Sequence, residues 1–107
     1  MLFLVRVHHG AGARFLEAYR QVRAAAAAVP GHLHDQVCAS PQDPRQWLIT
    51  SEWRTLQDFL DWEADPAHRE LVRPLRACVA SARSLRFEVR DETRGAAAPP
   101  VTAPHAA

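Results

Sequence analysis

Hydrophobic and polar residues recur with two different periods along this chain, which predicts four β-strands and two main helices. Residues 2–9, 45–53 and 84–91 show the period of two that is typical of strands, and residues 32–39 are predicted to form another strand. From residue 13 to 29, apolar residues recur three and four positions apart, as on the buried stripe of a helix. The resulting order, β-α-β-β-α-β, predicts an α+β fold of ferredoxin-like type, a four-stranded antiparallel sheet with both helices on one face.

The second helix is predicted from its capping residues and its prolines. Thr55 lies three residues before Asp58, a helix start in which the Thr hydroxyl accepts a backbone N–H. The helix then meets Pro66, which predicts a kink or a new first turn. It continues through Val72, and a short helical piece is expected near residues 75–80.

Length and composition predict one domain, residues 1–92, followed by a tail over residues 93–107. The tail consists mainly of Gly, Ala, Pro and Thr, which cannot bury enough surface to offset the entropy cost of ordering, so we expect it to be disordered. The formal charge is +1 and the basic residues are all Arg, a balance that does not favour nucleic acid as a partner. The apolar start of the chain is too short to span a membrane, so a soluble, cytoplasmic protein is expected. Cys38 and Cys78 lie among apolar residues and are expected to be free thiols.

Several classes of cofactor have no motif in the sequence. It contains no Gly-rich phosphate loop, no CxxC and no nucleophile elbow, so NAD, flavin and ATP are not expected. His32 and His34 share a predicted strand face, and His8 and His9 are adjacent. Neither pair has a third acidic or thiolate ligand at suitable spacing, so no metal site is expected.

The strongest functional signal lies where the third strand meets the second helix. Trp53 ends the strand, Trp62 follows on the helix, and His68 comes after Pro66. Large aromatic rings and an imidazole at such a junction suggest the wall of a pocket. Trp62 either stacks on a flat ligand or packs in the core, and Trp53 has a strong structural alternative. His68 is either a general base that titrates near neutral pH or an exposed helix residue.

Arg6 is the second candidate, because it interrupts an apolar strand. The first strand is apolar on both faces, so a buried guanidinium there needs an anionic partner. That partner is either a substrate oxyanion or a structural acid such as Glu52 or Asp35. Since the helices can cover only one face of the strand, a second copy of the sheet would cover the other.

The order of elements and three short motifs resemble the antibiotic biosynthesis monooxygenase family over residues 1–92. The motifs are Pro30-Gly31 before the second strand, Glu52-Trp53 at the end of the third, and Asp65-Pro66-Ala67-His68 in the second helix. The resemblance implies a homodimer of facing sheets, a dimeric α+β barrel, with a substrate pocket between sheet and helices in each subunit. Quinone-forming members oxidise anthrone-type polyketide intermediates with O₂ and without metal, flavin or haem. They deprotonate the substrate, and its anion passes an electron to O₂.

The chain departs from this family pattern at three positions. The resemblance implies that the quinone-forming members depend on an Asn–Trp pair. This chain contains Trp but no Asn, so the pair is incomplete. The haem-degrading branch resembles the chain at Trp62, but its Asn falls at Arg6 and its haem-ligating His falls at Val72. Haem is therefore not expected as a cofactor.

The leading hypothesis is a cofactor-independent monooxygenase acting on an aromatic, anthrone-like or phenolic polyketide intermediate. Trp62 would stack on the substrate, Arg6 would stabilise its anion and His68 would move the proton, with Trp53 and His34 completing the binding site. Two alternatives stay open. One is a polyketide cyclase or isomerase on the same fold, and the other is a non-catalytic dimeric module that binds small molecules.

Overall fold

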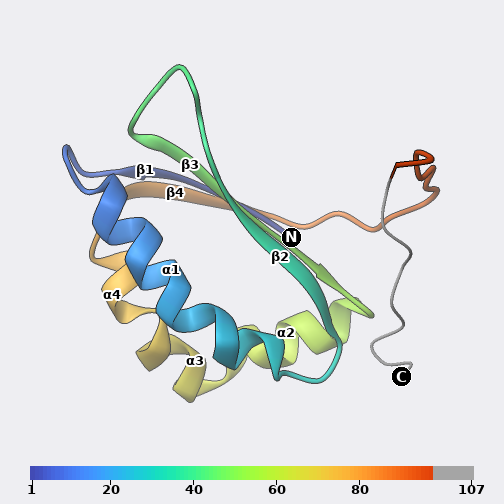
Figure 1. Cartoon of the computed structure of the whole chain (residues 1–107). Coiled ribbons are helices and arrows are strands. Elements are labelled where there is room, and N and C mark those ends of the chain that lie inside the picture. Colours follow the sequence, from blue (N-terminus) through green and yellow to red (C-terminus); the bar gives the residue numbers. More distant parts are fainter. Residues whose placement is uncertain (98–107) are drawn as a thin grey trace.

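The computed structural model describes residues 1–97, in which one antiparallel sheet carries its helices on a single face (Figure 1). The elements are, in chain order, β1 (Leu2–Val7), α1 (Gly12–Ala27), β2 (His32–Ala39), β3 (Gln46–Trp53), α2 (Leu56–Ala64), α3 (Pro66–Leu71), α4 (Arg73–Arg76) and β4 (Val79–Leu85). The strand order is β2-β3-β1-β4, with antiparallel pairing throughout. The predicted ferredoxin-like α+β fold is thereby confirmed. The part of the predicted tail from residue 98 onward lies outside the described residues.

The predicted second helix is three short helices, each started by local chemistry. The hydroxyl of Thr55 accepts the backbone N–H of Asp58 at 3.1 Å and caps α2, as expected. The carboxylate of Asp65 accepts the N–H of Ala67 at 2.9 Å and caps α3, with Pro66 in the first turn. Pro66 therefore starts a new helix, because proline lacks an N–H and fits a position that needs none.

The prediction of a last strand over residues 84–91 is wrong, because the strand occupies Val79–Leu85. The register explains the difference: Leu85 pairs with Leu2, where β1 begins, so residues beyond it have no neighbouring strand in the described part of the chain. Phe87 and Val89, whose alternation suggested a buried face, are 70 % and 73 % exposed. The helical piece expected near residues 75–80 is also displaced, since α4 is Arg73–Arg76.

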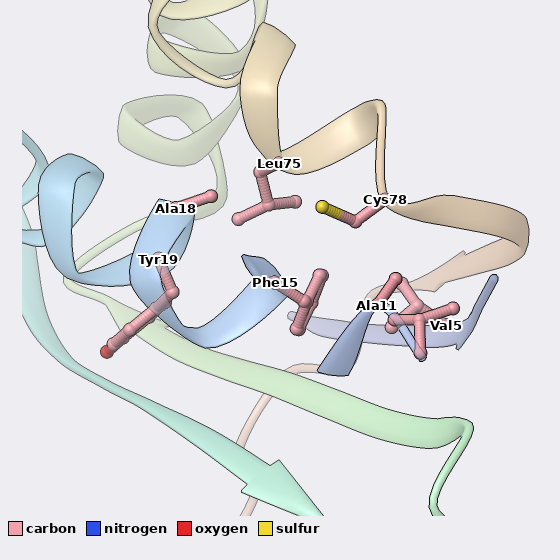
Figure 2. Close-up of a cluster of buried hydrophobic side chains, with 8 residues drawn as sticks. Val5, Ala11, Phe15, Ala18, Tyr19, Leu75 and Cys78 are labelled. Carbon is pink, nitrogen blue, oxygen red and sulfur yellow. The ribbon is translucent and has the colours of Figure 1, made fainter. Parts of the chain in front are cut away.

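The hydrophobic core lies between α1, α4 and the face of the sheet they cover (Figure 2). Phe15 is fully buried and Val7 is 1 % exposed. Tyr19, Leu75 and the free thiol of Cys78 pack in the same cluster. Alternate residues of β1 point into this core, which places the intervening residues on the opposite face of the sheet.

The opposite face of the sheet has no helix over it within the described residues (Figure 1). Leu4 of β1 pairs with Leu48 of β3, which in turn pairs with Cys38 of β2, so three apolar side chains lie in a row across the strands. No helix among the described residues is long and apolar enough to cross a membrane.

A glycine fixes the turn that leads from α1 into β2. Gly31 has φ +88°, a left-handed conformation that side chains disfavour. A Cβ at this position would also lie 2.3 Å from Oδ2 of Asp58, so the turn packs directly against the first turn of α2. This close approach sets His32, the next residue, beside the end of β3.

Candidate functional site

A cavity lies between the sheet and α1, α2 and α3, on the side of the sheet that the helices cover. Its wall is largely aromatic, with Phe3 and Trp53 from the sheet and Phe59 and Trp62 from α2. Polar side chains reach it from the sheet and from each of the helices α1, α2, α3 and α4. A mostly apolar cavity with a few convergent polar groups is typical of sites for small organic ligands.

Four rings form a continuous row along this wall. The ring centroids of His32 and Trp53 lie 5.2 Å apart, those of Trp53 and Trp62 5.1 Å apart, and those of Trp62 and His68 3.8 Å apart. Trp53 is fixed at the end of β3 because its indole N–H donates to the hydroxyl of Ser51 at 2.9 Å. The row therefore consists of two indoles with an imidazole at each end.

The structure brings Trp53, Trp62 and His68 together at this wall, the grouping expected from the sequence. His68 is half-buried rather than exposed, and its Nδ1 atom is buried without a hydrogen-bond partner among the described residues. Burial, reinforced by the positive charge of Arg76, lowers the pKa of His68 below its ordinary value of 6.5. The lowered pKa favours the neutral imidazole near pH 7, and a neutral imidazole has one nitrogen that can accept a proton.

Besides His68, the cavity contains a network of polar side chains that was not identified from the sequence. The carboxylate of Asp35 on β2 accepts a hydrogen bond from the hydroxyl of Tyr19 on α1 and contacts Nε2 of His32 at 2.8 Å. Burial, and then the hydrogen bond to Asp35, raises the pKa of Tyr19, which keeps its hydroxyl protonated as a donor. The signal that could have found this group was an acidic residue three positions after His32 on a strand facing the first helix.

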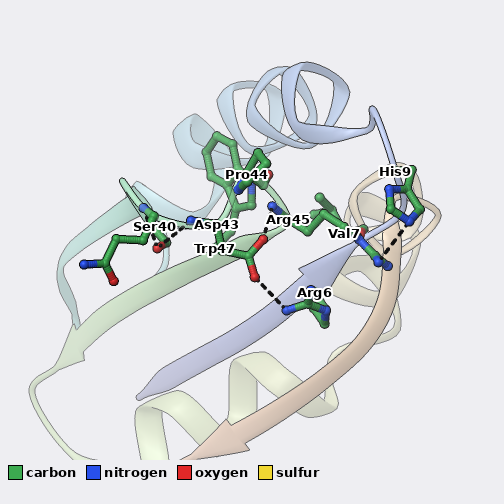
Figure 3. A network of polar contacts seen from close by, with 9 residues as sticks. Arg6, Val7, His9, Ser40, Asp43, Pro44, Arg45 and Trp47 are labelled. Atoms are coloured by element: carbon green, nitrogen blue, oxygen red, sulfur yellow. Dashed lines mark hydrogen bonds and ion pairs between the residues drawn. The ribbon is translucent and has the colours of Figure 1, made fainter.

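Arg6 does not lie in this cavity. Its side chain is 46 % exposed on the opposite face of the sheet, and its guanidinium pairs with Asp43 at 2.9 Å (Figure 3). The expectations of a buried guanidinium and of Glu52 or Asp35 as its structural partner are therefore wrong. They failed because the loop before β3 folds back beside β1 and supplies an acid that strand pairing could not reveal. The backbone N–H of Arg45, and then Arg6, holds the pKa of Asp43 below its ordinary value.

His34 is also outside the cavity lining, and its side chain is exposed. The sequence placed His32 and His34 on one strand face, but the pairing of β2 with β3 shifts register between them. Such a β-bulge changes the alternation of side chains. As a result His32, rather than His34, reaches the cavity together with Asp35.

The described residues, 1–97, contain no group of three or more His, Cys, Asp and Glu side chains that could hold a metal ion. His8 and His9 are exposed after β1, and a ring nitrogen of His9 lies 3.2 Å from the guanidinium of Arg45 (Figure 3). The ring nitrogen of His9 that could ligate a metal ion is thus already in contact with a positively charged side chain.

Val72 stands where the haem-degrading branch implies an axial ligand, and its surroundings do not fit that role. Its side chain is 7 % exposed in the cavity wall and has no atom that could ligate iron. His68 lies one turn earlier, with its ring against Trp62. The residues present therefore do not reproduce the ligand set implied by that branch.

Comparison with known proteins gives consistent matches. The family model described as "Antibiotic biosynthesis monooxygenase" matches residues 1–74. A 42.8 kDa protein of the whiE locus of Streptomyces coelicolor is 44% identical over 95 residues, which cover 89% of this chain. Polyketide synthase CurD of Streptomyces cyaneus is 45% identical over 91 residues, which cover 85% of this chain. The matched regions are 24% and 23% of those relatives, so the chain spans about a quarter of their length.

Solved structures share the fold at low sequence identity. SnoaB, a cofactor-independent oxygenase from Streptomyces nogalater, superposes with a TM-score of 0.68 at 19% identity and covers 84% of this chain and 94% of its own. The haem-degrader MhuD from Mycobacterium tuberculosis, with two haems bound in its active site, superposes with a TM-score of 0.71 at 22% identity. That match covers 87% of this chain and 96% of MhuD.

Proposed function

The chain belongs to the antibiotic biosynthesis monooxygenase family, and we propose that it oxidises a flat aromatic intermediate of polyketide type with O₂ and without a cofactor. One observation carries the proposal: the imidazole of His68, whose buried Nδ1 has no hydrogen-bond partner among residues 1–97, lies against the indole of Trp62 in the cavity wall. The similarity to the polyketide synthase CurD supports the substrate class, and the similarity to the cofactor-independent oxygenase SnoaB supports the absence of a cofactor.

The proposed chemistry begins with proton transfer to His68. The substrate ring lies against Trp62 and Trp53, and Nδ1 of His68 takes a proton from a phenol or from the acidic CH₂ of an anthrone-type ring. The resulting anion is electron-rich enough to pass one electron to O₂, and the two radicals then combine to form a C–O bond. His68 returns its proton to the peroxide so formed, the O–O bond breaks, and loss of water leaves a ketone, so that CH₂ and O₂ give C=O and H₂O in balance.

Arg76, rather than Arg6, is the arginine in a position to stabilise the substrate anion. It lines the cavity, and its positive charge acts on His68, whereas Arg6 faces the other side of the sheet. A cation beside the proton acceptor stabilises the substrate anion as it forms. We propose this role for Arg76, with Trp62 as the surface on which the ring stacks.

Oxygen uptake with a reduced tricyclic anthrone tests the reaction. We expect one O₂ consumed for each anthrone oxidised, at a rate that a chelator does not change, because the chemistry uses no metal. Turnover of the polyketide without O₂ consumption would instead indicate a cyclase or isomerase. Binding of the anthrone without turnover would contradict an enzymatic role and favour a binding module.

We also propose that two copies of the chain associate through the uncovered face of the sheet. Leu4, Leu48 and Cys38 form an apolar row there, and burial of such a row against a second sheet is favourable by about 25 cal/mol per Å². Light scattering is expected to give twice the chain mass, and Leu48→Glu is expected to shift the species towards monomer. A wild-type protein that is monomeric at all concentrations would contradict the facing-sheet arrangement.

A further inference from the structure

Tyr19, His32 and Asp35 form a hydrogen-bonded network in the cavity, with Asp35 at its centre. Tyr19 occupies one carboxylate oxygen of Asp35, and His32 occupies the other. The side chains of His32 and Asp35 are only 8 % and 14 % exposed. All three residues line the cavity. The network is therefore a buried feature of the cavity wall rather than a surface ion pair.

The pairing with Asp35 determines what His32 can offer a ligand. An ionised carboxylate only accepts hydrogen bonds, so Nε2 of His32 carries the hydrogen in this contact. In the neutral ring, Nδ1 is then an acceptor. A carboxylate that fixes the tautomer and the orientation of an imidazole in this way makes the second nitrogen a preorganised acceptor.

His32 and His68 stand at the two ends of the same row of rings, which indicates the kind of ligand that the cavity could bind. The two imidazoles lie at opposite ends of the row formed by Trp53 and Trp62. A flat ring system stacked on the indoles would have a proton acceptor near each end. His32 and His68 both line the cavity, so an acceptor on His32 is within reach of a ligand bound there.

We propose that His32, oriented by Asp35 and Tyr19, accepts a hydrogen bond from a ligand hydroxyl through Nδ1, and that the cavity selects flat polycyclic aromatics with a hydroxyl group at each end. This inference rests on the proposed function, because it assumes that an aromatic ligand occupies the cavity. His32 acts as the specificity-determining residue, while Asp35 and Tyr19 are positioning residues.

Two matched probes test the selection by equilibrium binding. We use 2,6-dihydroxynaphthalene, with a hydroxyl at each end, and 2-naphthol, which lacks one of them, and follow the quenching of tryptophan fluorescence. The wild-type protein is expected to bind the diol about tenfold more tightly, because 2-naphthol can form a hydrogen bond with only one of the two imidazoles. His32→Phe is expected to abolish this preference while retaining the affinity for 2-naphthol. Asp35→Asn, which keeps the shape but no longer fixes the tautomer, is expected to reduce the preference.

The wild-type protein also gives a readout that does not depend on any variant folding. In NMR spectra of isotope-labelled histidine, Nδ1 of His32 is expected to shift on addition of the diol and to stay unchanged on addition of 2-naphthol. Equal affinity for both probes, or equal loss of both in a folded His32→Phe, would overturn the inference and leave the proposed function standing. Failure of both probes to bind would contradict the aromatic-ligand site itself, and with it both proposals.

Discussion

Replacement of His68 by Gln is expected to lower kcat for anthrone oxidation by roughly 10²–10⁴-fold, the usual contribution of a general base. Gln fills a similar volume and can form hydrogen bonds, but it cannot accept the proton in the pH range where the reaction runs. The binding of an aromatic ligand should change much less, because the indoles of Trp53 and Trp62 remain in place. Initial rates of oxygen uptake and fluorescence titrations on the same variant measure the two effects separately.

The pH dependence supplies a second signature of the same base. Protonated His68 cannot accept a proton, so activity is expected to rise with pH as the imidazole loses its proton. Because the pKa of His68 is lowered from 6.5, the midpoint of the rise should lie on the acidic side of that value. His8→Gln is the matched control, since His8 is exposed and does not line the cavity. A rate within twofold of wild type in His68→Gln would show that another group takes the proton.

Replacement of Phe15 by Ala is expected to give the largest loss of stability, about 3–5 kcal/mol in the free energy of unfolding. Phe15 is fully buried between α1 and the sheet, and its ring centroid lies 5.5 Å from that of Trp47. Truncation removes the whole ring and leaves a cavity that the strands on one side cannot move to fill. Against a typical total of about 5–15 kcal/mol, this loss is a large fraction of the stability of the fold.

Urea unfolding, followed by circular dichroism, measures this change, and Phe87→Ala is its matched control. Phe87 is 70 % exposed beyond the end of β4, so its truncation should change the free energy of unfolding by less than about 0.5 kcal/mol. An effect of similar size in the two variants would contradict the assignment of the core to the space between α1 and the sheet.

Much of the fold could be predicted because it depends on local chemistry. The helix capped by Thr55, the new helix at Pro66 and the order of the elements along the chain all follow from residues close together in the sequence. The last strand was predicted wrongly because a strand needs a neighbour as well as an alternating pattern. Leu85 pairs with the start of β1, and the alternating residues after it, Phe87 and Val89, have nothing to pair with among the described residues.

The site was predictable in part for the same reason. Trp53, Trp62 and His68 are close in sequence, and the strand-to-helix junction folds them against one another. Arg6 and His34 were misplaced because their environments depend on distant segments: the loop carrying Asp43 in one case and the register shift of β2 against β3 in the other.

The sequence by itself therefore determined the order of elements, the family resemblance and the aromatic junction, because periodicity and capping act over a few residues. Only the tertiary structure decided which polar groups share the cavity. Asp35 contacts a tyrosine on α1 and a histidine on its own strand, and Nδ1 of His68 has no hydrogen-bond partner in the described part of the chain. Hydrogen bonds between side chains far apart in the chain depend on helix-to-sheet packing and strand register, which no short stretch of sequence specifies.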